Sequence, residues 1–106
     1  TAIAHRSGSV PALATPRVIS LSEEACVAVV EGRLEDGATT VGQRVQIDHL
    51  QPTAVGGRVT AEATLETVQG RRLTFTVNVQ DDRGLVAAGR ITRVVVDTGR
   101  FLDKLT

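Results

Sequence analysis

Four consecutive segments of alternating apolar and polar residues fill the second half of the chain, and they limit the fold more than any other feature. They span residues 41–50, 57–68, 71–81 and 85–97. A period of two is typical of strands that bury one face and expose the other. The connections at residues 69–70 and 82–84 are short, which predicts antiparallel neighbours. We therefore expect a four-stranded meander with one apolar face.

A single helix is predicted ahead of the meander, in the stretch ATPRVISLSEEACVAVVEG at residues 14–32. Thr15 is a good N-cap, Pro16 suits the first helical position, and Gly32 suits the position just past the last turn. Apolar residues surround most of this helix, which is typical of a helix buried in a core. Residues 33–40, which follow, are polar and rich in turn formers, so we expect a loop there.

The predicted elements follow the order strand, helix and meander if residues 1–6 form the first strand. The economical arrangement wraps one curved antiparallel sheet around the helix, which is an α+β architecture. The 106 residues suffice for one domain, residues 1–106, with a thin core. Association with a second copy is therefore a natural supplement to that core.

The composition argues against several classes of partner and ligand. Twelve basic residues balance twelve acidic ones, and the only aromatic residues are two Phe, which argues against nucleic-acid binding. No apolar run approaches the roughly 18 residues of a membrane span, so we expect a cytoplasmic protein with no membrane partner. Two histidines and one cysteine, at positions 5, 49 and 26, lack the spacing of a metal site. A phosphate-binding loop and a G-x-S-x-G elbow are also missing, and we expect no cofactor.

His49 interrupts the alternation near the end of its segment, VQIDHL. It closes the apolar row that contains Val45 and Ile47, and it should therefore point toward the core. A half-exposed histidine bonded to a neighbouring carbonyl at a strand end is the plain structural interpretation. An imidazole also suits proton transfer near neutral pH, so His49 is a candidate general base.

Charged residues interrupt two other apolar patterns. Glu23 and Glu24 lie in the middle of the apolar helix, and a solvated stripe would accommodate both. Arg93 lies on the apolar row of Ile91, unless a bulge near Gly89 turns it outward. Each interruption therefore has a structural explanation and also marks a candidate site residue.

Two further candidates follow from properties of the backbone. The helix that begins at Thr15 presents free N–H groups, which suit an oxyanion or a phosphate, although capping alone also explains the residue. Gly42 begins the strand that carries His49, and it would let a ligand approach the backbone closely.

Three stretches of the chain together resemble a known family. They are LATPRVISLSEEAC, TTVGQRVQIDHLQPTAVGGRVTAEATLETVQGRRLTF and GRITRVVVDTGRF, within about residues 8–104. In this order they resemble the hotdog-fold acyl-CoA thioesterases, specifically the fluoroacetyl-CoA thioesterase-like group. The resemblance implies a hotdog fold, a curved antiparallel sheet around one central helix, in a homodimer that hydrolyses acyl-CoA thioesters.

The resemblance also implies the working residues. The catalytic residues of the group are a Thr at the helix start, a Glu within the helix and a His on the following strand, which fall on Thr15, Glu23 and His49. A Gly that lines the substrate site falls on Gly42, and an Arg near the last strand falls on Arg93. CoA enters as part of the substrate and not as a cofactor.

One departure from the group concerns the substrate. The fluoroacetyl enzyme carries an aromatic residue in a lid shortly before its Thr, whereas the segment SGSVPALA before Thr15 contains none. We therefore expect a different or broader range of short acyl groups.

Spacing along the helix raises the question of which copy supplies each residue. Eight residues separate Thr15 from Glu23, about 12 Å along a helix, so the two side chains do not meet within one chain. We therefore expect a pocket between subunits, with these two residues on different copies. Either Thr15 attacks the thioester with His49 as base and Glu23 orienting the imidazole, or Glu23 or His49 activates water. Both routes stay open here, as do the copy that supplies His49 and a dimer of dimers.

Two other functions compete with hydrolysis. A hotdog hydratase or dehydratase pairs an Asp with a His a few residues on, but Asp48 adjoins His49, and adjacent strand residues point to opposite faces. A non-catalytic acyl-CoA-binding domain would keep the fold without turnover. Release of thiol from acyl-CoA would separate an enzyme from a binder.

Overall fold

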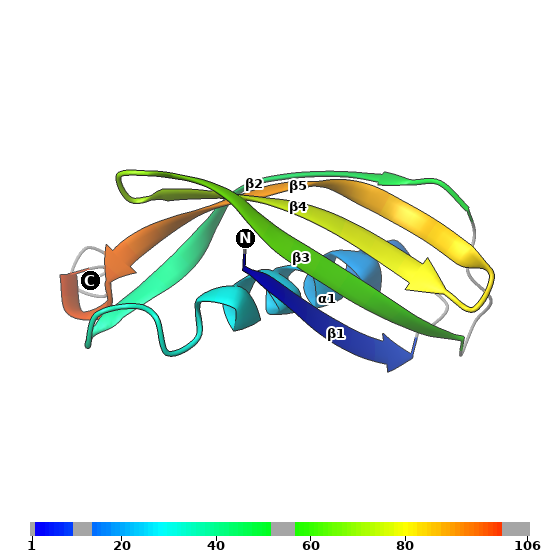
Figure 1. Cartoon of the computed structure of the whole chain (residues 1–106), viewed down its shortest axis with the longest axis horizontal. Helices are drawn as coiled ribbons and strands as arrows, with labels where there is room; N and C mark the ends of the chain where they lie inside the picture. Colours follow the sequence, from blue (N-terminus) through cyan, green and yellow to red (C-terminus); the bar gives the residue numbers. More distant parts are fainter. Residues whose placement is uncertain (1, 10–13, 52–56, 101–106) are drawn as a thin grey trace.

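The computed structural model describes residues 2–9, 14–51 and 57–100, without the side chains of Ala14 and Thr15. Its elements are β1 (Ile3–Ser9), α1 (Ala14–Val30), β2 (Ala38–His49), β3 (Arg58–Gln69), β4 (Arg72–Asp81) and β5 (Gly84–Asp97). Within these residues five strands form one antiparallel sheet in the order β1-β3-β4-β5-β2. Figure 1 shows α1 lying along the concave side of the curved sheet. The predicted α+β architecture, including the first strand, is confirmed.

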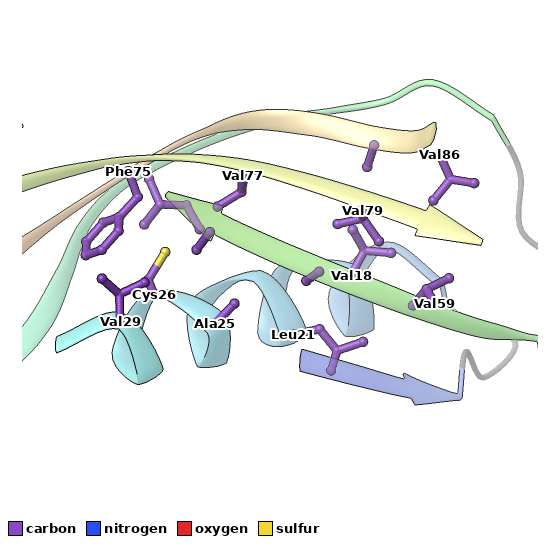
Figure 2. Close-up of a cluster of buried hydrophobic side chains, with 14 of the residues drawn as sticks. Val18, Leu21, Ala25, Cys26, Val29, Val59, Phe75, Val77, Val79 and Val86 are labelled. Carbon is purple, nitrogen blue, oxygen red and sulfur yellow. The ribbon is translucent and has the colours of Figure 1, made fainter. Parts of the chain in front are cut away.

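The core lies between α1 and the inner faces of β3, β4 and β5. Phe75 is fully buried there, and Figure 2 shows its ring close to Val29 and Cys26. The alternation predicted for β3 and β4 is confirmed, because their inward residues are buried: Val59, Ala61 and Ala63, then Leu73, Phe75, Val77 and Val79. Burying one large apolar side chain contributes about 1.5–3 kcal/mol, so this layer supplies much of the stability of a small domain.

Glycines end the helix and turn the chain where the sequence indicates. Gly32 follows α1 with a φ of 75°, and the N–H of Arg33 donates to the carbonyl of Val30 at 3.0 Å. Gly70 has a φ of 61° in the turn between β3 and β4. A positive φ strains residues that have a Cβ, so glycine fits both places.

The loop predicted over residues 33–40 is too long. β2 begins at Ala38, and Thr39 and Thr40 already pair with β5. Threonine is a good strand residue, and pairing with a long neighbouring strand overrides the polar character that predicted a loop. This shift matters for function because it brings Thr40 into the sheet.

The alternation of residues 85–97 puts Leu85 on the inward row of Ala87, Ile91 and Val95, and this prediction is wrong at Leu85. Val79 pairs with Ala87 but Gln80 pairs with Leu85, so Val86 is an extra residue in a bulge. Val86 is consequently buried, while Leu85 is 41% exposed.

The helix is buried only on the side that faces the sheet. Val18, Leu21 and Ala25 are enclosed, but Val27 is 45% exposed. The expectation of a helix covered on most sides is therefore wrong for a single chain. No helix in the described part of the chain is long and apolar enough to cross a membrane.

Candidate active site

An ion pair between α1 and β5 forms the centre of the site. Nη1 of Arg93 donates to Oε2 of Glu23 at 2.8 Å. The Arg93 side chain is 9% exposed and that of Glu23 is 34% exposed, so the guanidinium is enclosed while the carboxylate reaches solvent on one side. The inward direction of Arg93 is thus confirmed, and the alternative bulge near Gly89 is wrong because β5 pairs regularly with both neighbours there.

Glu24, the adjacent carboxylate, faces a different partner. Its Oε2 accepts from Nη1 of Arg17 at 3.1 Å, on the exposed side of α1. In the described part of the chain, the only hydrogen bond to the Glu23 side chain comes from Arg93. Oε1 of Glu23 is therefore available to water, a substrate group or an imidazole.

Gly42 lies against the ion pair on β2. A Cβ at this position would be 3.0 Å from Oε2 of Glu23 and 3.7 Å from Nη1 of Arg93. The pairing with β5 shifts register between Gly42 and Arg44, so the strand is bulged just beyond the glycine. The missing side chain is what lets the carboxylate approach the β2 backbone.

Thr40 belongs to the same cluster and was missed in the sequence. Its Oγ1 accepts from Nε of Arg93 at 2.9 Å, and its carbonyl oxygen accepts from Nη2 at 2.9 Å. Thr40 is 8% exposed. The alternation in the stretch TTVG puts Thr40 and Gly42 on one face, which is a usable signal once the strand is known to start at Ala38.

Cys26 lies one helical turn beyond Glu23 and is fully buried. Burial raises the pKa of the Cys26 thiol to about 12, with a smaller lowering by Arg93 and a smaller rise from Glu23. The thiol is therefore neutral near pH 7 and is not a nucleophile. It provides an uncharged wall beside the ion pair.

His49 ends β2 and does not reach this ion pair within one chain. It pairs with the buried Ala87, so it lies on the helix-facing side of the sheet, as the alternation predicts. β2 is an edge strand and α1 packs mainly against β1 and β3, which leaves His49 exposed. Seven residues separate it from Gly42, about 20 Å along a strand. A single chain thus holds the imidazole and the Glu23 carboxylate far apart.

The other histidine occupies the opposite face of the sheet. Nε2 of His5 lies 2.6 Å from Oε2 of Glu62, and this hydrogen bond lowers the pKa of the Glu62 carboxyl. Glu62 alternates with the buried Ala61 and Ala63, so the pair faces away from α1.

Thr15 lies in the first turn of α1, and its side chain is outside the described residues. Residues 10–13 of the preceding segment SGSVPALA also lie outside them. Of the predicted site residues, one chain therefore brings together Glu23, Gly42 and Arg93. The roles of Thr15 and His49 stay predictions.

A groove of about 860 Å³ runs between α1 and the start of β2. Glu23, Thr40 and Arg93 line it, together with five apolar residues, Val27, Ala28, Val30, Leu34 and Ala38. Five acidic side chains also line it, against two arginines, Arg6 and Arg93. The groove thus offers apolar surface and an excess of negative charge. Among the described residues, no group of three or more His, Cys, Asp or Glu side chains is arranged to hold a metal ion.

A curved antiparallel sheet around one central helix is the architecture of a hotdog-fold protein, and Glu23 and Arg93 place an ion pair between that helix and the sheet. The family model for the fluoroacetyl-CoA-specific thioesterase FlK matches residues 1–99, and the chain belongs to this family.

Individual relatives agree with this assignment. The fluoroacetyl-CoA thioesterase of Streptantibioticus cattleyicolor is 33% identical over 92 residues, which are 87% of this chain and 66% of that protein. The chain thus spans just under two thirds of that relative's length. The structure of FlK matches with a TM-score of 0.90 and 26% identity, over 97% of this chain and 91% of that one.

Two further structures extend the comparison. An FlK variant in complex with acetyl-CoA matches with a TM-score of 0.86 and 25% identity, over 97% of this chain and 92% of that one. A hot-dog-like protein from Thermanaerovibrio acidaminovorans has the same fold, with a TM-score of 0.90 and 23% identity, over 97% of this chain and 87% of that one.

Proposed function

We propose that this protein hydrolyses acyl-CoA thioesters with short, uncharged acyl groups, in an active site shared by two copies of the chain. The observation that carries the proposal is the Glu23 carboxylate, held through one oxygen by Arg93 and approached closely by the backbone at Gly42. Membership in the thioesterase family supports the reaction type.

Thioester hydrolysis needs a nucleophile, a proton acceptor and donors for the oxyanion. The oxygen of water, or of the Thr15 hydroxyl, adds to the thioester carbonyl and gives its proton to a base; the C–S bond then breaks, and CoA leaves as a thiol after gaining that proton. If Thr15 is the nucleophile, the acyl group is left as an ester on Thr15, and water then hydrolyses this ester to release the acid. Oε1 of Glu23 either accepts the proton of water or orients the imidazole of His49, because Oε2 is engaged by Arg93. The N–H groups at the start of α1 suit the oxyanion.

The edge strand β2 favours association with a second copy of the chain. β2 has 12 residues, and one of its sides pairs with none of the other described strands. Val45 and Leu50 near it are 38% and 54% exposed. A long edge strand with apolar side chains is a template for pairing with another chain. Pairing two β2 strands would also cover part of the thin core, and the exposed Val27 on α1 leaves room for a dimer of dimers.

Antiparallel pairing of two β2 strands would also solve the distance problem at His49. If the two-fold axis passes near Gln46, Gly42 of one copy faces His49 of the partner subunit. Gly42 and His49 are seven residues apart, a spacing that puts two residues of a regular strand on opposite faces, and the extra residue Gln43 in the bulge brings them back to the same face. Gly42 and His49 both pair with inward residues of β5, so they share the helix-facing side. The imidazole of one copy then approaches the Glu23 carboxylate of the other.

The groove beside Glu23 indicates the acyl group. Its apolar lining suits a short hydrocarbon, and its excess of carboxylates disfavours acyl groups that carry a negative charge. The same charges would repel the phosphates of CoA, so we place the acyl end here and the nucleotide elsewhere. The FlK variant that holds acetyl-CoA supports a small acyl group. A cytoplasmic location stays part of this proposal.

A panel of acyl-CoA thioesters tests the proposal by release of thiol. Acetyl-, propionyl- and butyryl-CoA should be turned over, fluoroacetyl-CoA should not be strongly preferred, and succinyl-CoA should be poor. His49→Ala should lower kcat by about 10²–10⁴-fold, the usual contribution of a general base. His5→Ala is the matched control and should keep the kcat of the unmodified protein. No thiol release from any member, with binding retained, would make the protein an acyl-CoA-binding domain.

The hydratase alternative has a separate readout. Asp48 pairs with Ala88 while His49 pairs with the buried Ala87, so the two side chains point to opposite faces. Crotonyl-CoA should therefore lose thiol or remain unchanged, without gaining water across its double bond. Formation of 3-hydroxybutyryl-CoA would contradict the hydrolase assignment.

A further inference from the structure

Thr40 is a buried polar residue of the site without a role in the proposed reaction. Its hydroxyl accepts from Nε of Arg93 and its carbonyl accepts from Nη2, both at 2.9 Å. Nη1 of the same guanidinium donates to Glu23 at 2.8 Å. One residue at the start of β2 therefore binds one edge of the guanidinium, and the remaining nitrogen faces the carboxylate.

The planarity of the guanidinium makes this arrangement directional. Its N–H donors lie in one plane in a fixed fork, so two bonds along one edge determine where the third nitrogen points. Glu23 lies on a different element, α1, and its carboxylate makes no other hydrogen bond among the described residues. The position of that carboxylate thus depends on a chain of contacts from β2 through Arg93 to α1.

Little else near Arg93 could replace the Thr40 hydroxyl. Arg93 pairs across the sheet with the apolar Leu73 on one side and with Gly42 on the other. Cys26 nearby is buried, and the described residues give the Arg93 side chain no acceptors beyond Thr40 and Glu23. Without the hydroxyl, the Nε–H loses its acceptor, and the single remaining bond from Nη2 to the Thr40 carbonyl no longer fixes the orientation of the guanidinium.

We propose that Thr40 is a positioning residue for hydrolysis, which orients Arg93 so that Arg93 holds Glu23 in line with the thioester. The inference rests on the proposed function and adds a residue that acts through Arg93 and does not touch the substrate. A misplacement of about 1 Å in a catalytic group costs up to about 100-fold in rate, so loss of the hydroxyl should be visible in kcat.

Thr40→Val and Thr40→Ser test the inference in the full chain with acetyl-CoA. Valine keeps the branched shape and removes the acceptor, so kcat should fall by about 10- to 100-fold with KM changed by less than about twofold. Serine keeps the acceptor and should retain kcat within about threefold. Thr92→Val is the matched control, because Thr92 pairs with Arg44 and Thr74 on the outer face of the sheet, and it should keep the original kcat.

A double-mutant cycle separates positioning from a general loss of structure. In the Glu23→Gln background, Thr40→Val should cost little further rate, because its effect passes through that carboxylate. An undiminished effect in this background, a rise in KM alone, or full kcat in Thr40→Val would each overturn the inference. If Thr40→Val does not fold, as judged by circular dichroism, Thr40→Ala takes its place in the cycle.

Failure of the proposed function would give a different result. If the unmodified protein releases no thiol from any acyl-CoA, the hydrolase proposal falls before the variants are compared. If it does release thiol and the Thr40 variants match it, only the positioning role is lost.

Discussion

Arg93 is a cation in the wall of an apolar core, and its three hydrogen bonds explain how the core holds it. Glu23 neutralises the charge and Thr40 satisfies the remaining edge. Burying an unpaired charge costs several kcal/mol, so such a residue persists only with its partners in place. The two partners come from α1 and β2 and Arg93 itself from β5, which makes the cluster sensitive to small displacements of any of these three elements.

Replacement of Arg93 should damage the reaction even when the charge is kept. Arg93→Lys should lower kcat by at least about 10-fold, because an ammonium on a flexible stem does not reproduce the planar fork to Thr40 and Glu23. Arg93→Leu should lower kcat at least as much, since Glu23 then loses the only hydrogen-bond donor that the described residues give it. Steady-state kinetics with acetyl-CoA measures both variants. A kcat for Arg93→Lys equal to that of the unmodified protein would show that the reaction does not need the planar guanidinium.

Gly42→Ala should move the carboxylate and leave the fold intact. The new Cβ would lie 3.0 Å from Oε2 of Glu23, which is tighter than an ordinary contact, and a flexible carboxylate yields to it by a small shift. We expect kcat to fall by about 10-fold and the free energy of unfolding to change by less than about 1 kcal/mol. Steady-state kinetics measures kcat, and urea unfolding measures the free energy of unfolding. A large loss of stability with unchanged kcat would show that Gly42 does not lie against the Glu23 carboxylate.

The Cys26 thiol should make stability fall at high pH. Its folded pKa is raised from 9.0 to about 12, so the unfolded chain releases this proton first. The stabilisation is complete below pH 9 and declines by about 1.4 kcal/mol for each pH unit from there toward pH 12. The chain contains no Tyr and a single Lys, so few other groups titrate in this window.

Urea unfolding of the protein and of Cys26→Ala from pH 8 to 11 measures that decline. The alanine variant should show a flatter dependence, because the group with the raised pKa is gone. Equal slopes for the two proteins would show that Cys26 does not control alkaline stability.

At the scale of elements, β2 is the strand whose position decides the site. Among the described strands it pairs only with β5, and α1 packs mainly against β1 and β3. It nevertheless carries Thr40, Gly42 and His49, all on its helix-facing side. In the proposed function, its bulge beyond Gly42 and its length beyond the core therefore serve the site as well as the sheet.

Gly89→Ala should detach β2 from β5. A Cβ at Gly89 would collide with the backbone carbonyl of Gln46, and backbone cannot move aside as a side chain can. We expect a loss of about 3 kcal/mol or more and faster hydrogen exchange across β2. Gly70→Ala is the control, since it has open space but a φ of 61°, and should cost about 1–2 kcal/mol. Similar losses for the two variants would argue against the close approach.

At the scale of the whole molecule, the proposed active site is shared by two chains, because His49 lies at the end of β2 and Glu23 of the same chain lies against Gly42, near the start of that strand. A mixture of Glu23→Gln and His49→Ala proteins tests this directly. Each variant alone should be nearly inactive, because every one of its sites lacks one residue. In a mixed dimer, one site receives an intact Glu23 and an intact His49, and the other receives neither.

Equal amounts of the two variants, exchanged by mild denaturation and refolding, should recover about a quarter of the original activity if the site is shared. Half of the dimers would be mixed, and half of their sites would be intact. A mixture no more active than its components would place Glu23 and His49 in the same chain. Refolding each variant alone controls for any gain from the treatment.

The sequence alone determined the elements and the identity of most candidate residues. Alternation in β3 and β4, the capping residues of α1 and the glycine at its end predict local structure because strand and helix periods act within a few residues. The same patterns single out Glu23, Arg93 and His49 as polar residues in apolar rows. The resemblance to a family then gave these residues roles that spacing alone left open.

Tertiary structure decided the rest, because it depends on pairing between distant segments. The bulge at Val86 exposed Leu85, and the early start of β2 buried Thr40 against Arg93, 53 residues away. The periodicity of the helix left Glu23 and Glu24 equivalent and the family resemblance chose Glu23, but only the packing of α1 against the sheet showed that Glu23 faces Arg93 and Glu24 faces Arg17. Local patterns set which residues can form a strand or helix, whereas register, bulges and edges set which of them meet.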